Sequence, residues 1–119
     1  MTAHFYHRKL ARVLDRMGGL YNPNDILAEI AEGRMQSFVE GDSWAITRLA
    51  EYPRAKVLEL LLVVGRLDEA LALQDRILDF AAEVGAGVVQ AYGRKGWLAH
   101  AQARGWKVKT VNYVYVKDM

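Results

Sequence analysis

The chain has 119 residues, no cysteine and a formal net charge of +2 at pH 7. This length fits one domain spanning residues 1–119, and the lack of cysteine excludes disulfides, thiolate metal sites and cysteine nucleophiles. The first residues form no continuous apolar segment of the signal-peptide type, so we expect a cytoplasmic protein. The small net charge argues against a nucleic-acid partner, and no segment suits a membrane.

Two helices are predicted in the N-terminal part of the chain. Apolar residues recur at intervals of three and four over residues 5–17, and basic residues lie largely on the other face. Those basic residues are Arg8, Lys9, Arg12 and Arg16. They suit either a solvated surface or contact with phosphates or an acidic partner. A second helix begins after Asn22, whose side chain can cap it, and ends at Gly33.

Three strands are predicted next, over residues 35–40, 43–52 and 55–64. Only two residues separate each strand from the next, which favours an antiparallel meander. The third strand contains the longest apolar run of the chain, interrupted only by Glu59. Such a run is typical of a strand that is buried on both faces.

A long helix over residues 66–84 and a short strand over residues 88–92 complete a crossover, so this strand should run parallel to the strand over 55–64. The predicted buried face of the helix consists of Leu67, Ala70, Leu71, Gln74, Ile77, Leu78, Ala81 and Val84. A short helix over 97–104 and a terminal strand over 106–117 follow. The predicted fold class is α/β, with a mixed sheet flanked by helices.

This order of elements resembles the fold of the GNAT family of N-acetyltransferases over nearly the whole chain. Residues 40–46 look like the family's hairpin between its second and third strands, and residues 55–64 look like its fourth strand. Residues 98–106, which end in Gly105-Trp106, look like its short last helix. The resemblance implies acetyl-CoA as the cofactor of an active member, with its pyrophosphate held by a glycine-rich loop after the fourth strand.

The loop at that position departs from the family pattern. It is several residues shorter and contains only Gly65, and Asp68 and Glu69 stand where the phosphates would lie. The same two acids also suit the first turn of a helix, where they complement its dipole. The candidate cofactor-binding residues are Leu62, Val63, Val64, Gly65, Arg66 and Arg94. Arg94 belongs to a basic glycine turn that suits either anion binding or a plain strand-to-helix connection.

The catalytic candidates are Glu59 and His100. The family often uses a tyrosine of the last helix as general acid, and here His100 is the only titratable substitute, unless it is a surface residue. Glu59 is a candidate general base; alternatively it pairs with Arg48 or Lys109 on a neighbouring strand. His4 and His7 lack a third ligand at suitable spacing, so no metal site is expected.

Two functions remain open on the sequence. In the first, the chain is a GNAT-fold protein with a degenerate acetyl-CoA loop and no cofactor, and it acts by contact with a protein partner or as a homo-oligomer. Short GNAT-like proteins of bacteriophages, some connected with virion assembly, look similar, and such a protein would lie in the host cytoplasm or in the virion. In the second, it is an atypical acetyl-CoA-dependent N-acetyltransferase that acts on an amine.

Overall fold

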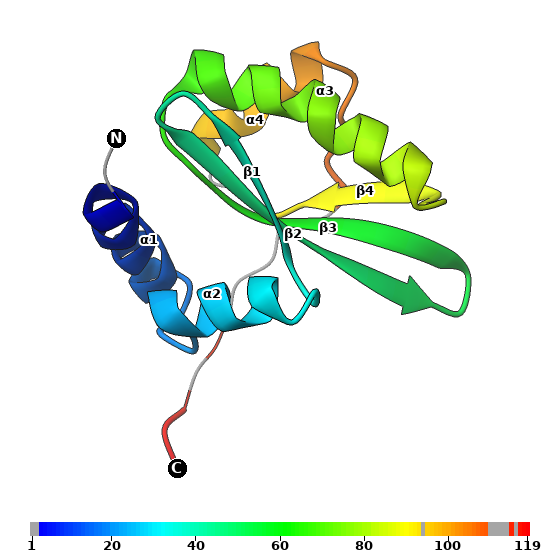
Figure 1. Ribbon diagram of the computed structural model, residues 1–119. Helices are drawn as coiled ribbons and strands as arrows, with labels where there is room; N and C mark the ends of the chain where they lie inside the picture. Colours follow the sequence, from blue (N-terminus) through cyan, green and yellow to red (C-terminus); the bar gives the residue numbers. More distant parts are fainter. Residues whose placement is uncertain (1–2, 94, 110–114, 116) are drawn as a thin grey trace.

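The computed structural model describes residues 3–93, 95–109, 115 and 117–119, without the side chains of residues 3–7, 95 and 98. Two helices come first, then three strands, a long helix, a fourth strand and two short helical segments (Figure 1). The elements are α1 (Ala3–Arg16), α2 (Pro23–Ala31), β1 (Gln36–Glu40), β2 (Ser43–Tyr52), β3 (Ala55–Val64), α3 (Leu67–Glu83), β4 (Val88–Ala91), the 3-10 turn η1 (Lys95–Trp97) and α4 (Leu98–Ala103).

The start of α2 confirms the predicted cap at Asn22. The Asp25 backbone N–H donates to Asn22 Oδ1 at 2.9 Å, and the Asn22 backbone N–H donates to Asp25 Oδ2 at 2.8 Å. Each side chain therefore satisfies a backbone donor that the helix leaves free at its first turn, with Pro23 at the position where no N–H is needed. This reciprocal arrangement fixes where α2 begins.

The sheet has four strands in the order β1-β2-β3-β4. The first three form the predicted antiparallel meander, and β4 pairs in parallel with β3 after the α3 crossover. The predicted α/β fold class with a mixed sheet is therefore confirmed. Helices α1 and α2 lie on one face of the sheet, and α3 and α4 lie on the other (Figure 1).

A β-bulge in β3 changes which face its side chains reach. Ile46 of β2 pairs with Leu62, whereas the next residue, Thr47, pairs with Leu60, so Leu61 is an extra residue in β3. Side chains alternate between the faces of a strand, and one inserted residue inverts that alternation. As a result, Leu58 packs under α3 while Leu62 packs under α1 and α2.

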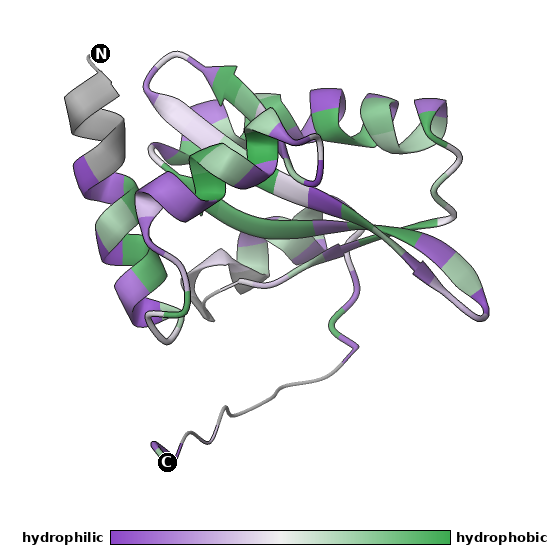
Figure 2. Cartoon of the chain, turned by 60° about the horizontal axis from the view of Figure 1, so that its bottom comes forward, coloured by the Kyte–Doolittle hydropathy of each residue, from purple (hydrophilic) through white to green (hydrophobic). Residues whose placement is uncertain are grey.

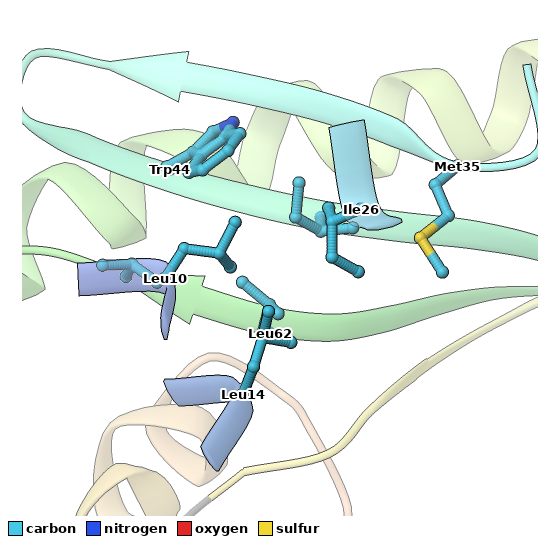
Figure 3. Packing of buried hydrophobic residues seen from close by; sticks show 8 residues of the cluster. Leu10, Leu14, Ile26, Met35, Trp44 and Leu62 are labelled. Atoms are coloured by element: carbon cyan, nitrogen blue, oxygen red, sulfur yellow. The ribbon is translucent and has the colours of Figure 1, made fainter. Parts of the chain in front are cut away.

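Two hydrophobic clusters hold the layers together, one on each face of the sheet. The first joins α1 and α2 to β2 and β3 and consists of Leu10, Leu14, Ile26, Met35, Trp44, Ile46, Leu62 and Val64 (Figure 3). The second joins α3 to the same strands and consists of Ala45, Leu58, Leu73, Ile77 and Ala81. Because both clusters draw on β3, its apolar run is needed on both faces, as the sequence predicted.

The buried face of α3 differs from the predicted one. Its buried residues are Leu73, Ile77 and Ala81, whereas Leu67 is 37% exposed and Leu78 is 38% exposed. The prediction was right for Ile77 and Ala81, missed Leu73 and wrongly included Leu67 and Leu78. The error is a rotation of the helix about its axis, because apolar residues cover a wide arc of α3 and only the sheet selects the part of that arc that is buried.

The predicted terminal strand is not formed over the part that the structure describes. Trp106 to Lys109 have no regular secondary structure, and the Trp106 indole N–H instead donates to Gln74 Oε1 of α3 at 3.0 Å. Most of the remaining prediction, residues 110–114 and 116, lies outside the described residues. Among the described residues, no helix combines the length and the apolar character that crossing a bilayer requires.

Replacing Leu58 by Ala should destabilise the protein by about 2–5 kcal/mol, because the side chain is fully buried between α3 and the sheet. Leu20→Ala is the matched control, since Leu20 is 85% exposed, and it should change stability by less than about 0.5 kcal/mol. Urea denaturation of both variants measures the difference. Equal stability of the two variants would contradict the packing described here.

Candidate functional site

The candidate site lies where β3 and β4 diverge. The two strands pair from Val57–Val88 to Leu60–Ala91, and the Tyr92 backbone N–H still donates to the Leu60 carbonyl at 3.2 Å. Beyond this point β3 continues to Val64, and no described residue pairs with it on the β4 side. The bulge at Leu61 falls at the start of this unpaired stretch.

Backbone groups of β3 are directed into the divergence. The Leu60 carbonyl faces β4, because it accepts from the Tyr92 N–H, and the extra residue Leu61 shifts the alternation so that the N–H and C=O of Val63 also face away from β2. On that side they can donate to and accept from an extended group. This main-chain edge, rather than any side chain of Leu62 to Val64, is the candidate binding feature of the strand.

Glu59 lies just before the divergence and is 2% exposed. Its Oε1 accepts from the Arg48 guanidinium at 3.4 Å, and its Oε2 accepts from the hydroxyls of Tyr92 at 3.0 Å and Tyr52 at 3.5 Å. The predicted pairing with Arg48 is thus confirmed, and Arg48 stands directly opposite Glu59 in the ladder. A buried carboxylate needs such partners, because burial without them would be costly.

Tyr92 connects this carboxylate to the end of β4. Tyr92 is 53% exposed, and partial desolvation of its phenol, followed by the hydrogen bond to Glu59, raises the pKa of Tyr92 above its ordinary value of 10.0. The sequence pattern predicted no role for Tyr92 or Tyr52. Tyr52 is adjacent to a turn and Tyr92 is 33 residues from Glu59, so no local pattern connects them to the carboxylate.

The turn between β3 and α3 is closed by contacts within the chain. Gly65 has φ of 132°, and a Cβ there would stand 2.6 Å from the Ser43 backbone Cα. The Arg66 backbone N–H donates to Ser43 Oγ at 2.8 Å, and that hydroxyl donates to Glu69 Oε1 at 2.9 Å. Glu69 Oε2 also accepts from the Asp42 backbone N–H at 3.2 Å. We call this set of four residues, Asp42, Ser43, Arg66 and Glu69, the turn network.

The structure separates the other candidate residues. Leu62 and Val64 are buried under α1 and α2, and Val63 packs partly beneath α3. Arg66 is exposed and forms an ion pair with Asp68 at 3.3 Å. His100 is exposed in the last turn of α4, which confirms the surface alternative for its position, and Arg94 lies outside the described residues.

Metal binding finds no support in the described part of the chain. Among those residues, no group of three or more His, Asp or Glu side chains could hold a metal ion. The side chains of His4 and His7 belong to the portion that is not described.

Solved structures of other proteins share this arrangement. A probable acetyltransferase superposes with a TM-score of 0.72 at 11% identity, and the match covers 98% of this chain and 93% of that one. The ribosomal-protein-alanine N-acetyltransferase of Brucella melitensis biovar Abortus 2308 gives a TM-score of 0.63 at 15% identity, with 93% of each chain covered. A transcriptional regulator from Bacillus halodurans C-125 gives 0.72 at 14% identity, covering 98% and 96%. The fold is GNAT-like.

Comparison of sequences alone does not connect this chain with these proteins. No protein-family model matches it, and a comparison with curated proteins found no match. Because a fold can support unrelated functions, the GNAT-like architecture does not by itself assign an activity. An activity therefore has to be argued from the residues of the site.

Acetyl-CoA fits this site only in part. The main-chain edge at Val63 suits an extended, amide-bearing chain. The strand–helix turn does not suit a diphosphate, because Glu69 already accepts the Asp42 N–H and the Ser43 hydroxyl, and Asp68 lies in the same helical turn. A diphosphate would meet two carboxylates there instead of open backbone donors.

Gly65→Ala should destabilise the protein by about 1–3 kcal/mol from backbone strain alone, with a further loss from the clash against Ser43. Gly87→Ala is the matched control, because a Cβ there meets no atom within 4 Å and its φ is ordinary. Thermal and urea denaturation compare the two variants. A tolerated Ala at position 65 would show that the turn is looser than described.

Tyr92 should make stability depend on pH in the alkaline range. The folded chain holds the phenolic proton more tightly than the unfolded chain, so this contribution is complete below the unfolded pKa of about 10 and is lost as pH rises through the raised folded pKa. Tyr92→Phe should flatten the fall in unfolding free energy above pH about 10. Tyr115→Phe, at a 92% exposed position, should leave that fall unchanged.

Proposed function

We propose that this chain is a GNAT-fold protein that does not use acetyl-CoA and acts by contact with another protein molecule. The turn network carries the proposal: the backbone and hydroxyl donors beside the β3–α3 turn are occupied by the Glu69 carboxylate. The resemblance to short bacteriophage proteins extends this proposal to a role in virion assembly. Co-purification of the chain with virus particles tests this more specific proposal.

Electrostatics support the loss of cofactor binding. A phosphate about 4 Å from an acidic side chain experiences roughly 4 kcal/mol of repulsion at an effective dielectric constant of about 20. Arg66 would be the natural compensating cation, but it already pairs with Asp68. Displacing Glu69 to make room would also break its hydrogen bonds to Asp42 and Ser43.

The second candidate function is an atypical acetyl-CoA-dependent N-acetyltransferase that acts on an amine. The observation in its favour is the divergence of β3 and β4 with the bulge at Leu61, which leaves the main-chain edge at Val63 open on one side. Against it stands Glu59, the best-placed base, because both of its oxygens already accept hydrogen bonds from three side chains. A base in that state has to give up a partner before it can accept a proton.

Titration with acetyl-CoA should give no heat and no thermal shift up to millimolar ligand. A site filled to about 100 times its Kd would add about 2.7 kcal/mol of stability, which either method detects. A GNAT acetyltransferase with an intact glycine-rich loop serves as the positive control. Binding that is lost in Arg66→Ala would contradict the proposal and favour the N-acetyltransferase.

A further inference from the structure

Two charged rows of opposite sign run along helices on opposite sides of the molecule. On α1, Arg8, Arg12 and Arg16 are exposed and lie four residues apart. On α3, Asp75, Asp79 and Glu83 are exposed and have the same spacing. At 1.5 Å per residue each row is about 12 Å long. We call them the basic row and the acidic row, and hydrophilic bands recur along both helices in Figure 2.

Neither row is neutralised within the described side chains. The four ion pairs that the structure shows there involve Glu29–Arg34, Arg48–Glu59, Arg66–Asp68 and Glu40–Arg76, and none uses a member of either row. The rows cannot meet within one chain, because α1 packs on one face of the sheet and α3 packs on the other. Their charges are therefore available to another molecule.

We propose that the basic row of one copy docks against the acidic row of a second copy, with the two helices antiparallel. This inference rests on the proposed function and names its partner as the same chain. Matched spacing and opposite sign are the complementarity that selects a partner and its register.

The antiparallel orientation follows from the order of charges. It sets Arg16 opposite Asp75, Arg12 opposite Asp79 and Arg8 opposite Glu83. Of the remaining charged residues of these turns, Asp15 then lies opposite Arg76, and Lys9 lies opposite the neutral Ala82. In the parallel orientation Arg12 would keep Asp79, but Lys9 would face Arg76, which is a repulsive pair.

The two rows differ, so this contact is heterologous. Each copy offers one basic row and one acidic row, and both remain available at the ends of a pair. Association therefore continues into a ring or an open chain and does not stop at a two-fold dimer. Exposed ion pairs are individually weak and are screened by salt, so assembly should be weak and strongly dependent on ionic strength.

Sedimentation velocity of the full chain tests this proposal. At about 20 mM salt the sedimentation coefficient should rise with protein concentration past that of a dimer, and at about 500 mM it should return to that of the monomer. A chain that stays monomeric at low salt overturns the inference. Assembly that is unaffected by salt also overturns it, because an apolar contact would then be responsible.

Charge reversal locates the contact. Two triple variants should each weaken assembly roughly tenfold or more. One replaces Arg8, Arg12 and Arg16 by Glu, and the other replaces Asp75, Asp79 and Glu83 by Lys. An equal mixture of the two variants should restore it, because each then presents the row that the other needs. The matched control replaces Arg54, Lys107 and Lys109 by Glu. These exposed residues lie outside both rows, and this variant has the same net charge as the variant with a reversed basic row. Failure of the mixture to assemble, or loss of assembly in the control, overturns the proposal.

Cysteine cross-linking tests the orientation, since the natural chain has no cysteine. Arg8→Cys mixed with Glu83→Cys should form a disulfide between copies at low salt, and Arg8→Cys mixed with Asp75→Cys should not. The reverse result overturns the antiparallel register. Acetyl-CoA binding would overturn the proposed function without affecting this assembly, so the two failures are distinguishable.

Discussion

The extra residue at Leu61 is the constraint on which the rest of the structure depends. Without it, Leu58 and Leu62 would face the same side of the sheet, and each helical layer would meet a different set of β3 side chains. With it, Leu58 packs under α3 and Leu62 packs under α1 and α2. The bulge also lies where β4 leaves β3, so the residue that sets the packing of both layers stands at the opening of the sheet.

The contacts on either side of this opening support the proposal that this GNAT-like chain does not use acetyl-CoA. Before it, Glu59 is held by Arg48, Tyr52 and Tyr92, which makes the carboxylate part of the architecture. After it, Glu69 and Ser43 bind the β1–β2 hairpin to the start of α3. A short turn with a single glycine can be stable because these side chains satisfy its backbone.

Much of the fold could be predicted because its signals are local. The Asn22 cap, the two-residue turns and the apolar run around Glu59 depend on neighbouring residues. The structure contains every predicted element up to α4, with similar bounds. The rotation of α3 could not be predicted, because the apolar arc of that helix is wider than the face that the sheet buries. The prediction for residues 106–109 was wrong for a related reason: alternation favours a strand, but a strand also needs an adjacent edge, and Trp106 binds α3 instead.

The sequence by itself determined the order of elements, the mixed sheet and the short turn after β3, and it left the pairing of Glu59 with Arg48 as an open alternative. These follow from periodicity, turn chemistry and strand register, all of which act over short separations. Only the tertiary structure decided that Glu69 binds Ser43, that Tyr92 binds Glu59 and that a bulge lies at Leu61. Those contacts join residues that are 26 and 33 positions apart, and packing of whole layers brings them together.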